Sequence, residues 1–215
     1  VPVEAALAPA WREIVEQHNR VGFEGTFVSV EPISRDEISR HPWVMAGGGA
    51  RTLLKRLERE AKPLLHLVED VGFASFPATD DAFVLPDHAV RKVGAPATFH
   101  RSYVPGDAVR DWGFQSTETA IAPYSPPEYS LVALSELGPA ARHFWNLRTT
   151  INSTKGFGGK TRGDGGEPYW AWYRWIAERY RRPLRLSFPH VATHNHFSLD
   201  RGGHVFNQHA PVVLL

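Results

Sequence analysis

Residues 184–215, LRLSFPHVATHNHFSLDRGGHVFNQHAPVVLL, contain the pattern on which the predicted fold class most depends. Short apolar runs in this stretch are separated by Pro, Gly, Asn and Asp, residues that favour turns between β-strands. The predicted strands are residues 184–188, 197–199, 204–206 and 212–215. The segment from Asp200 to Gly203 predicts a hairpin turn between the second and third strands. We therefore expect the carboxyl-terminal end of the chain to be rich in β-structure.

Helical patterns and further short strands precede this stretch. Residues 9–18 place Trp11, Ile14 and Val15 on one side of a predicted helix. Ser34 and Glu37 have the spacing of a capping box, which predicts one or two helical turns. Further helices are expected over residues 53–65 with a kink at Pro63, 136–147 and 169–180, and further strands over residues 72–76, 82–85, 99–103 and 119–122.

Together these elements predict an α+β fold, in which mixed small sheets pack against helices. Residues 1–70 are mainly helical and are predicted to form a connecting or spacer region. Residues 71–215 are predicted to form a second region of mixed α/β structure. The chain begins with Val1 and finishes on an apolar run, so we expect it to be a segment cut from a longer protein.

The composition excludes several classes of protein. The 215 residues include no cysteine, which rules out disulfides, thiolate metal sites and a catalytic thiol. No apolar run approaches the roughly eighteen residues of a transmembrane helix, and the amino end has no signal-peptide pattern. These absences predict a cytoplasmic protein that does not interact with membranes.

Charge is distributed unevenly along the chain although the formal net charge is only +1. Residues 1–136 hold 13 Lys and Arg against 19 Asp and Glu, whereas residues 137–215 hold 11 against 4. Basic side chains neutralise phosphates and release bound counterions, so such polarity is typical of a surface that binds a polyanion. A solvated basic surface without a partner is the alternative interpretation of the same pattern.

The segment from Arg148 to Arg185 contains most of the residues that we predict to bind DNA. It holds nine Lys and Arg against three Asp and Glu, and residues 152–168 include six glycines. Arg, Lys and Asn are the side chains that pair with guanine and adenine edges, and a glycine-rich loop is able to enter a groove. The candidate DNA-binding residues in this segment are Arg148, Asn152, Thr154, Lys155, Lys160, Arg162 and Arg174. For its aromatic cluster, residues 169–175, core packing is favoured over base stacking.

Two other motifs contain residue types found in nucleotide-binding and metal-binding sites, but their spacing fits neither kind of site. Gly47 to Gly49 precede a helix and lack the pattern of a dinucleotide or P-loop motif, although a helix opened by glycines is able to hold a phosphate. The contiguous His194-Asn195-His196 puts both imidazoles on one face of a strand, with no converging carboxylate or thiolate. We predict no metal site there, and we add His194 and Asn195 to the candidate DNA-binding residues.

The sequence of residues 190–213 closely resembles the carboxyl-terminal part of PglX-like adenine-specific DNA methyltransferases of BREX (phage growth limitation) defence systems. It resembles type IIG restriction-modification methylases more loosely. Three further pieces occur in the same order: His41 to Ala50, Gly106 to Trp112, and the basic stretch that ends at Leu184. The second piece is interpreted as a structural strand and turn.

In that family, an amino-terminal domain binds S-adenosylmethionine and uses an NPPY motif to methylate a flipped adenine, while later regions recognise the target sequence. This chain resembles the later regions and contains neither NPPY nor the glycine-rich cofactor motif. The resemblance therefore implies a DNA target-recognition segment, with no catalytic residues and no cofactor of its own. S-adenosylmethionine would belong to the parent enzyme.

The expected partner is double-stranded DNA, and two alternatives remain open. One is a metal-dependent nuclease built on the histidine-rich tail, which would bind a divalent metal at His194 or His196. The other is a docking module for other defence proteins, or for an inhibitor that mimics DNA, because both would use the same basic face.

Overall fold

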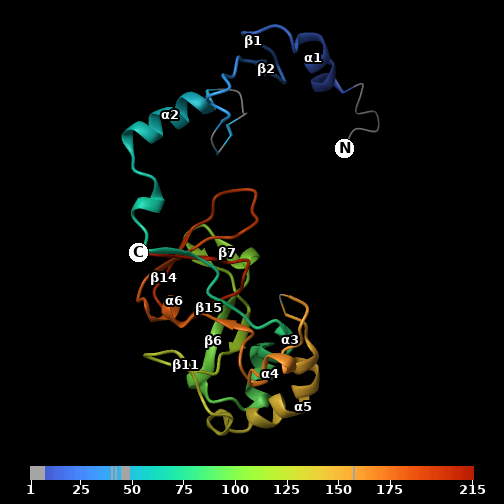
Figure 1. The fold of residues 1–215 in the computed structure, drawn as a ribbon, viewed down its shortest axis with the longest axis vertical. Coiled ribbons are helices and arrows are strands. Elements are labelled where there is room, and N and C mark those ends of the chain that lie inside the picture. Colours follow the sequence, from blue (N-terminus) through green and yellow to red (C-terminus); the bar gives the residue numbers. More distant parts are fainter. Residues whose placement is uncertain (1–7, 40, 42, 45–48, 157) are drawn as a thin grey trace. The chain divides into compact units, whose positions relative to one another are not determined.

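The structure is a computed structural model, and it describes residues 8–39, 41, 43–44, 49–156 and 158–215. The chain divides into two compact units, Val1–His66 and Leu67–Leu215 (Figure 1). This division lies close to the boundary predicted between residues 70 and 71. In the part of the chain that the structure describes, no helix has the length and apolar character needed to cross a membrane.

The first unit contains the two long helices predicted for it. Its elements are α1 (Pro9–Gln17), β1 (Phe23–Glu24), β2 (Ser29–Val30), α2 (Ala50–Glu60) and the 3-10 helix η2 (Leu64–His66). Gly49 opens α2 in the left-handed conformation, with φ of +81°. The predicted turn at Ser34 forms a hydrogen bond from the Glu37 amide to the Ser34 hydroxyl (3.2 Å) but no helix. Gly47 and Gly48 of the glycine run before α2 lie outside the described residues.

Two four-stranded sheets organise the second unit. The first is antiparallel, in the order β14 (Ser198–Asp200), β13 (Arg185–Ser187), β16 (Val212–Leu214) and β3 (Asp70–Gly72). The second has the order β15 (His204–Phe206), β6 (His100–Val104), β9 (Glu118–Ile121) and β5 (Val84–Pro86), with β15 parallel to β6. The four strands predicted from residues 184–215 are therefore confirmed.

Short helices and three two-stranded pairs complete the second unit. The helices are α3 (Asp80–Phe83), α4 (Asp87–Val93), α5 (Ala140–Ser153) and α6 (Ala177–Arg181), with 3-10 helices η3 (Ala97–Phe99), η4 (Gly106–Ala108), η5 (Leu134–Leu137) and η6 (Gly163–Gly165). The strand pairs are β4 (Ser75–Phe76) with β12 (Arg174–Trp175), β7 (Val109–Arg110) with β8 (Gly113–Phe114), and β10 (Tyr124–Ser125) with β11 (Ser130–Leu131). Helices beside several small sheets confirm the predicted α+β class.

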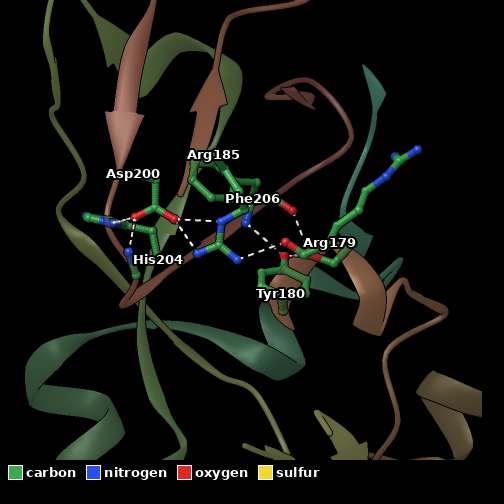
Figure 2. Close-up of polar contacts among 8 residues, drawn as sticks. Arg179, Tyr180, Arg185, Asp200, His204 and Phe206 are labelled. Atoms are coloured by element: carbon green, nitrogen blue, oxygen red, sulfur yellow. Dashed lines mark hydrogen bonds and ion pairs between the residues drawn. The ribbon is translucent and has the colours of Figure 1, made fainter. Parts of the chain in front are cut away.

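The hairpin predicted at Asp200 to Gly203 is wrong, because β14 and β15 belong to different sheets. Asp200 is fully buried, and its side chain holds the connection between them. One carboxylate oxygen accepts hydrogen bonds from the Gly202 amide (3.0 Å) and His204 Nδ1 (2.7 Å). The other pairs with the Arg185 guanidinium, as Figure 2 shows. A turn that is typical of hairpins thus serves as a bridge between two sheets.

The helix predicted over residues 169–180 is also wrong, except for its last turn, which is the start of α6. Trp175 lies on β12 and stacks between Tyr124 and Tyr180, at ring-centroid distances of 4.0 and 4.1 Å. Its indole N–H donates to the Tyr129 carbonyl, and that of Trp172 donates to the Ile121 carbonyl. Similarly, the strand predicted over residues 82–85 begins as α3 and becomes β5 only at Val84. The aromatic cluster is part of the core, as the favoured interpretation predicted.

Candidate nucleic-acid interface

The glycine-rich segment after α5 is a narrow loop whose two sides are hydrogen-bonded to each other. Lys155 and Thr161 form an isolated antiparallel bridge, and the Gly156 amide donates to the Lys160 carbonyl (3.0 Å). Gly158 and Gly159 at the loop end have positive φ, a conformation that glycine adopts without steric cost. The loop is narrow, so the side chains of Lys155 and Lys160 lie on its outside and are exposed.

Arg162 anchors the base of this loop inside the protein, and its predicted role as a DNA contact is therefore corrected. The residue is 3% exposed, and its guanidinium donates to the carbonyls of Pro77 (3.2 Å) and Ala171. Burial lowers the pKa of Arg162, because the charged form loses hydration. A guanidinium held in this way contributes to the position of the loop and presents no donor to a phosphate.

Most other cations of the segment Arg148–Arg185 are committed to partners within the chain. Arg179 pairs with Asp70, Arg182 with Glu69 and Arg185 with Asp200. Arg181 lies 3.8 Å from the Glu178 carboxylate and also donates to the Glu128 carbonyl. Among the described residues, Lys155, Lys160 and Arg174 are the cations of this segment that have an exposed side chain and no ion pair. The charge available to a polyanion is thus concentrated near the loop.

Arg174 is linked to the loop through an aromatic ring. Its guanidinium lies over the Tyr173 ring, 4.7 Å from the centroid. A side chain at Gly156 would collide with that same ring, so the loop backbone packs directly against Tyr173. Arg174 and the Lys155–Lys160 loop therefore belong to one cluster, which we call the basic loop cluster: Lys155, Gly156, Lys160, Tyr173 and Arg174.

The remaining predicted residues of this segment lie at the end of α5. Arg148 is half-buried, with its guanidinium 3.9 Å from the centroid of the Trp145 ring. Asn152 is also half-buried, close enough to Gly163 to contact a Cβ placed there. The Thr154 hydroxyl donates to the Thr150 carbonyl and lies 3.0 Å from the Thr79 hydroxyl. Thr154 thereby connects the basic loop cluster to the residues that precede α3.

A second set of polar residues begins at Asp80, next to Thr79, and was not predicted from the sequence. The Tyr103 hydroxyl on β6 donates to the Asp80 carboxylate (3.2 Å) and also interacts with Asn207. Burial raises the pKa of Asp80 although the hydrogen bond from Tyr103 opposes the shift. Asn207 also accepts a hydrogen bond from the His209 amide (2.8 Å). Asp80, Tyr103, Asn207 and His209 form what we call the polar cluster.

Residues 188–197, between β13 and β14, form what we call the histidine-rich loop, and this loop continues the series of contacts. The His190 amide donates to the His209 carbonyl (2.8 Å), which connects the loop to the polar cluster. His194 and Asn195 are exposed near its far end, and His196 Nδ1 bonds the Asp111 carboxylate (2.9 Å). Within the described residues, no three His, Asp or Glu side chains converge as metal ligands.

A series of contacts links the two loops that carry the residues predicted to bind DNA. Hydrogen bonds, together with the chain neighbours Thr79 and Asp80, connect Thr154 through Tyr103, Asn207 and His209 to His190, at the start of the loop that carries His194 and Asn195. At one end of this series lie cations that have no ion pair among the described residues. Amide, imidazole and carboxylate groups lie along the rest of it. Cations attract phosphates without regard to sequence, whereas amides and carboxylates distinguish base edges. The arrangement is therefore suited to a nucleic acid, with separate places for backbone contact and base readout.

The fold is similar to part of one solved restriction-modification enzyme. It is similar to part of the type IIL restriction-modification enzyme MmeI, solved in complex with DNA, with a TM-score of 0.50 and 10% sequence identity. The similarity covers 67% of this chain and 19% of MmeI. At this identity the match shows a shared fold only.

The sequence itself is similar to one particular methyltransferase. The whole chain is 32% identical over 216 residues to the adenine-specific methyltransferase PglX of Streptomyces coelicolor, of which it spans 18%. No protein-family model matches the chain. The resemblance stated from the sequence is confirmed: the chain is similar along its full length to a segment of PglX, and its fold occurs in a restriction-modification enzyme. The chain thus spans less than a fifth of each of these proteins.

Proposed function

We propose that this chain is a DNA target-recognition segment of an adenine-specific DNA methyltransferase that acts in phage defence in the cytoplasm. The observation that carries the proposal is the contact path from the basic loop cluster to the polar cluster and the histidine-rich loop. The similarity to PglX and to part of MmeI, which was solved in complex with DNA, supports the same function. Duplex DNA is the proposed partner.

Backbone contacts are assigned to Lys155, Lys160 and Arg174. Their side chains are exposed and have no carboxylate partner among the described residues, so their charge is available to phosphates. Arg148, at the end of α5, is a weaker candidate because its guanidinium lies over Trp145. These contacts would position the duplex without selecting its sequence.

Base readout is assigned to the polar side chains along the path. A carboxylate repels phosphates, so Asp80 is not expected to contact the DNA backbone. It is a candidate for base readout because a carboxylate accepts a hydrogen bond from the exocyclic amine of cytosine or adenine. Asn207, Asn195, His194 and Asn152 supply further amide and imidazole groups, and Thr154 supplies a hydroxyl. The sequence preference of the parent enzyme would depend on this set.

Methyl transfer is assigned to parts of the parent outside this chain. The described residues offer no strand–glycine turn–helix of the kind that holds a nucleotide-like cofactor: Gly158 and Gly159 follow a helix, and Gly49 opens α2 in a unit with one two-stranded sheet. This supports the proposal that S-adenosylmethionine binds elsewhere in the parent enzyme, and no catalytic step is derived for these residues.

Salt-dependent DNA binding tests the proposal. Binding of the chain to a random-sequence duplex is measured by fluorescence anisotropy between roughly 50 and 200 mM salt, where each phosphate contact contributes about 0.9 to the log–log slope. The double variant Lys155→Ala/Lys160→Ala should bind more weakly, with a slope reduced by about two. The matched control Arg91→Ala/Lys92→Ala removes two exposed charges from α4 and should leave the slope unchanged.

Two outcomes of this assay would count against the proposal, and a selection experiment tests base readout separately. Equal slopes for both double variants would show that the basic loop cluster is not the phosphate-binding surface. Weak binding without salt dependence would instead favour a docking module for other defence proteins or for an inhibitor that mimics DNA. Selection from a randomised duplex pool tests base readout, because Asp80→Asn should change the selected sequence and leave the salt slope intact.

A further inference from the structure

Trp112 occupies the tight turn between β7 and β8. Arg110 and Gly113 are register partners across this strand pair, so Asp111 and Trp112 form a two-residue connection. Trp112 is 91% exposed, and its φ is +65°. The largest side chain in proteins is therefore placed in solvent on a backbone conformation that favours glycine or asparagine.

Neither burial nor local conformation explains a tryptophan at this position. At 91% exposure the indole ring gains almost nothing from removal of apolar surface from water. A left-handed conformation is unfavourable for bulky side chains, and such strained residues are concentrated at binding and catalytic sites. Gly or Asn at this position would give a more stable fold than Trp does. The ring is therefore available for a contact outside this chain.

The turn is held firmly in place beneath the ring. The Trp112 amide donates to the Phe197 carbonyl (3.2 Å), and Asp111 bonds His196. Phe114, two residues further on, packs on His204 and Phe206 at ring-centroid distances of 4.7 and 5.6 Å. Because His204 is itself bonded to the buried Asp200 (Figure 2), the turn rests on the link between the two sheets. A ring presented from a fixed base loses little entropy when it binds.

The surroundings of Trp112 combine one flat ring with polar groups that suit nucleic acid. His196 bonds its neighbour Asp111, and the His194 ring lies 6.2 Å from that of His196. The same loop carries the exposed Asn195, together with apolar surface from Val191 and Phe197. Asp111, the carboxylate of the turn, is engaged by His196. An aromatic ring beside polar side chains stacks on a base of duplex DNA once that base has been unstacked from its neighbours.

We propose that Trp112 stacks on a nucleobase of the bound DNA, at the end of the contact path opposite the basic loop cluster. The proposal rests on the proposed DNA-recognition function and adds to it an aromatic contact that supplies affinity without charge. The histidine-rich loop would flank the stacked base, with His194 and Asn195 at its edge.

The test compares Trp112→Ala and Trp112→Phe in the anisotropy assay. Loss of the ring should weaken binding by about 5- to 100-fold, the range that corresponds to one base–aromatic stack. Phe keeps an aromatic face and should restore most of the affinity. Because the indole carries no charge, the salt slope of Trp112→Ala should equal that of wild type. The control Trp11→Ala removes another exposed tryptophan, on α1, and should bind as wild type does.

A second readout follows the ring itself. Quenching of tryptophan fluorescence on DNA addition, compared between wild type and Trp112→Phe, should show a component that the variant lacks. Thermal unfolding of Trp112→Ala should match that of wild type, because the lost ring is exposed and alanine keeps the Cβ that the left-handed backbone already accommodates.

The outcomes distinguish this proposal from the function on which it rests. If wild type binds DNA with a steep salt slope and Trp112→Ala binds equally well, the stacking proposal is overturned and the recognition function stands. Equal losses in the Ala and Phe variants would also overturn stacking. If wild type binds no DNA at any salt concentration tested, both proposals fail together.

Discussion

Arg185 and Asp200 are register partners across the antiparallel strands β13 and β14, and their side chains form an ion pair that is 3% and 0% exposed. The pair lies beside Tyr180, whose hydroxyl is 2.7 Å from Ser75 Oγ and accepts from the Phe206 amide. Figure 2 shows the Arg185–Asp200 pair and the Tyr180 hydroxyl close together in the second unit, where the Arg185 guanidinium lies 5.2 Å from the centroid of the Tyr180 ring. Because His204 belongs to the other sheet, its bond to Asp200 fixes the two sheets relative to each other.

Loss of one member of this ion pair should destabilise the second unit strongly. Asp200→Ala leaves the Arg185 cation buried without its carboxylate, and removal of one partner of a buried pair costs about 3–5 kcal/mol. The free energy of unfolding, measured by urea denaturation, should fall by that amount. The double variant Arg185→Met/Asp200→Leu removes both charges and should recover much of the loss. A double variant no more stable than Asp200→Ala would contradict this explanation.

The same carboxylate predicts the direction of the pH dependence. Burial alone would raise the pKa of Asp200, but the hydrogen bond from His204 and the charge of Arg185 outweigh it, so the pKa is lowered. A folded-state pKa below the unfolded value of about 3.9 means that the unfolded chain takes up the proton first. The stabilisation is present above about pH 4 and is lost as the pH falls further. Urea midpoints measured from pH 7 to 3 should decline more steeply for wild type than for the Arg185→Met/Asp200→Leu variant.

Replacement of Arg162 should affect the order of the glycine-rich loop rather than phosphate binding. Arg162→Ala removes charge-assisted hydrogen bonds to Pro77 and Ala171, each worth about 1.5–3 kcal/mol. We expect a lower free energy of unfolding and faster proteolysis near Gly158 and Gly159, with a salt slope for DNA binding close to that of wild type. The control Lys160→Ala should do the reverse, with unchanged stability and a reduced slope. A slope reduced by about one in Arg162→Ala at full stability would restore it as a phosphate contact.

The elements predicted best from the sequence are those specified by short-range patterns. The four strands of residues 184–215 were predicted because each is an apolar run between turn residues. Helix α2 was predicted for a similar reason, since Leu53, Leu54 and Leu57 repeat at helical spacing and Pro63 limits its length. Neither case required knowledge of a distant partner.

The incorrect predictions share a dependence on partners far away in the sequence. Trp172 and Trp175 repeat at a spacing that helices also have, but they are fixed by the carbonyls of Ile121 and Tyr129. The segment Asp200 to Gly203 resembles a hairpin turn, yet β15 pairs with β6, about a hundred residues earlier in the chain. Local periodicity carries no information on such pairings.

The candidate site was predictable in part for the same reason. Lys155 and Lys160, in the glycine-rich loop, are exposed and have no ion pair within the described residues, as DNA contacts would require, but their role stays a prediction. Arg162, seven residues after Lys155, was misplaced because the two carbonyls that bind it come from elsewhere. No sequence motif marks Asp80, and only the fold brings Tyr103 and Asn207 together beside it.

The strand pair β3–β16 joins the beginning and the end of the second unit (Figure 1). Asp70 and Leu214 are register partners, and the Glu69 amide donates to the Leu214 carbonyl. Pairing of residues so far apart in the chain closes a large loop, so this strand pair adds to the non-local contacts that slow the folding of a domain.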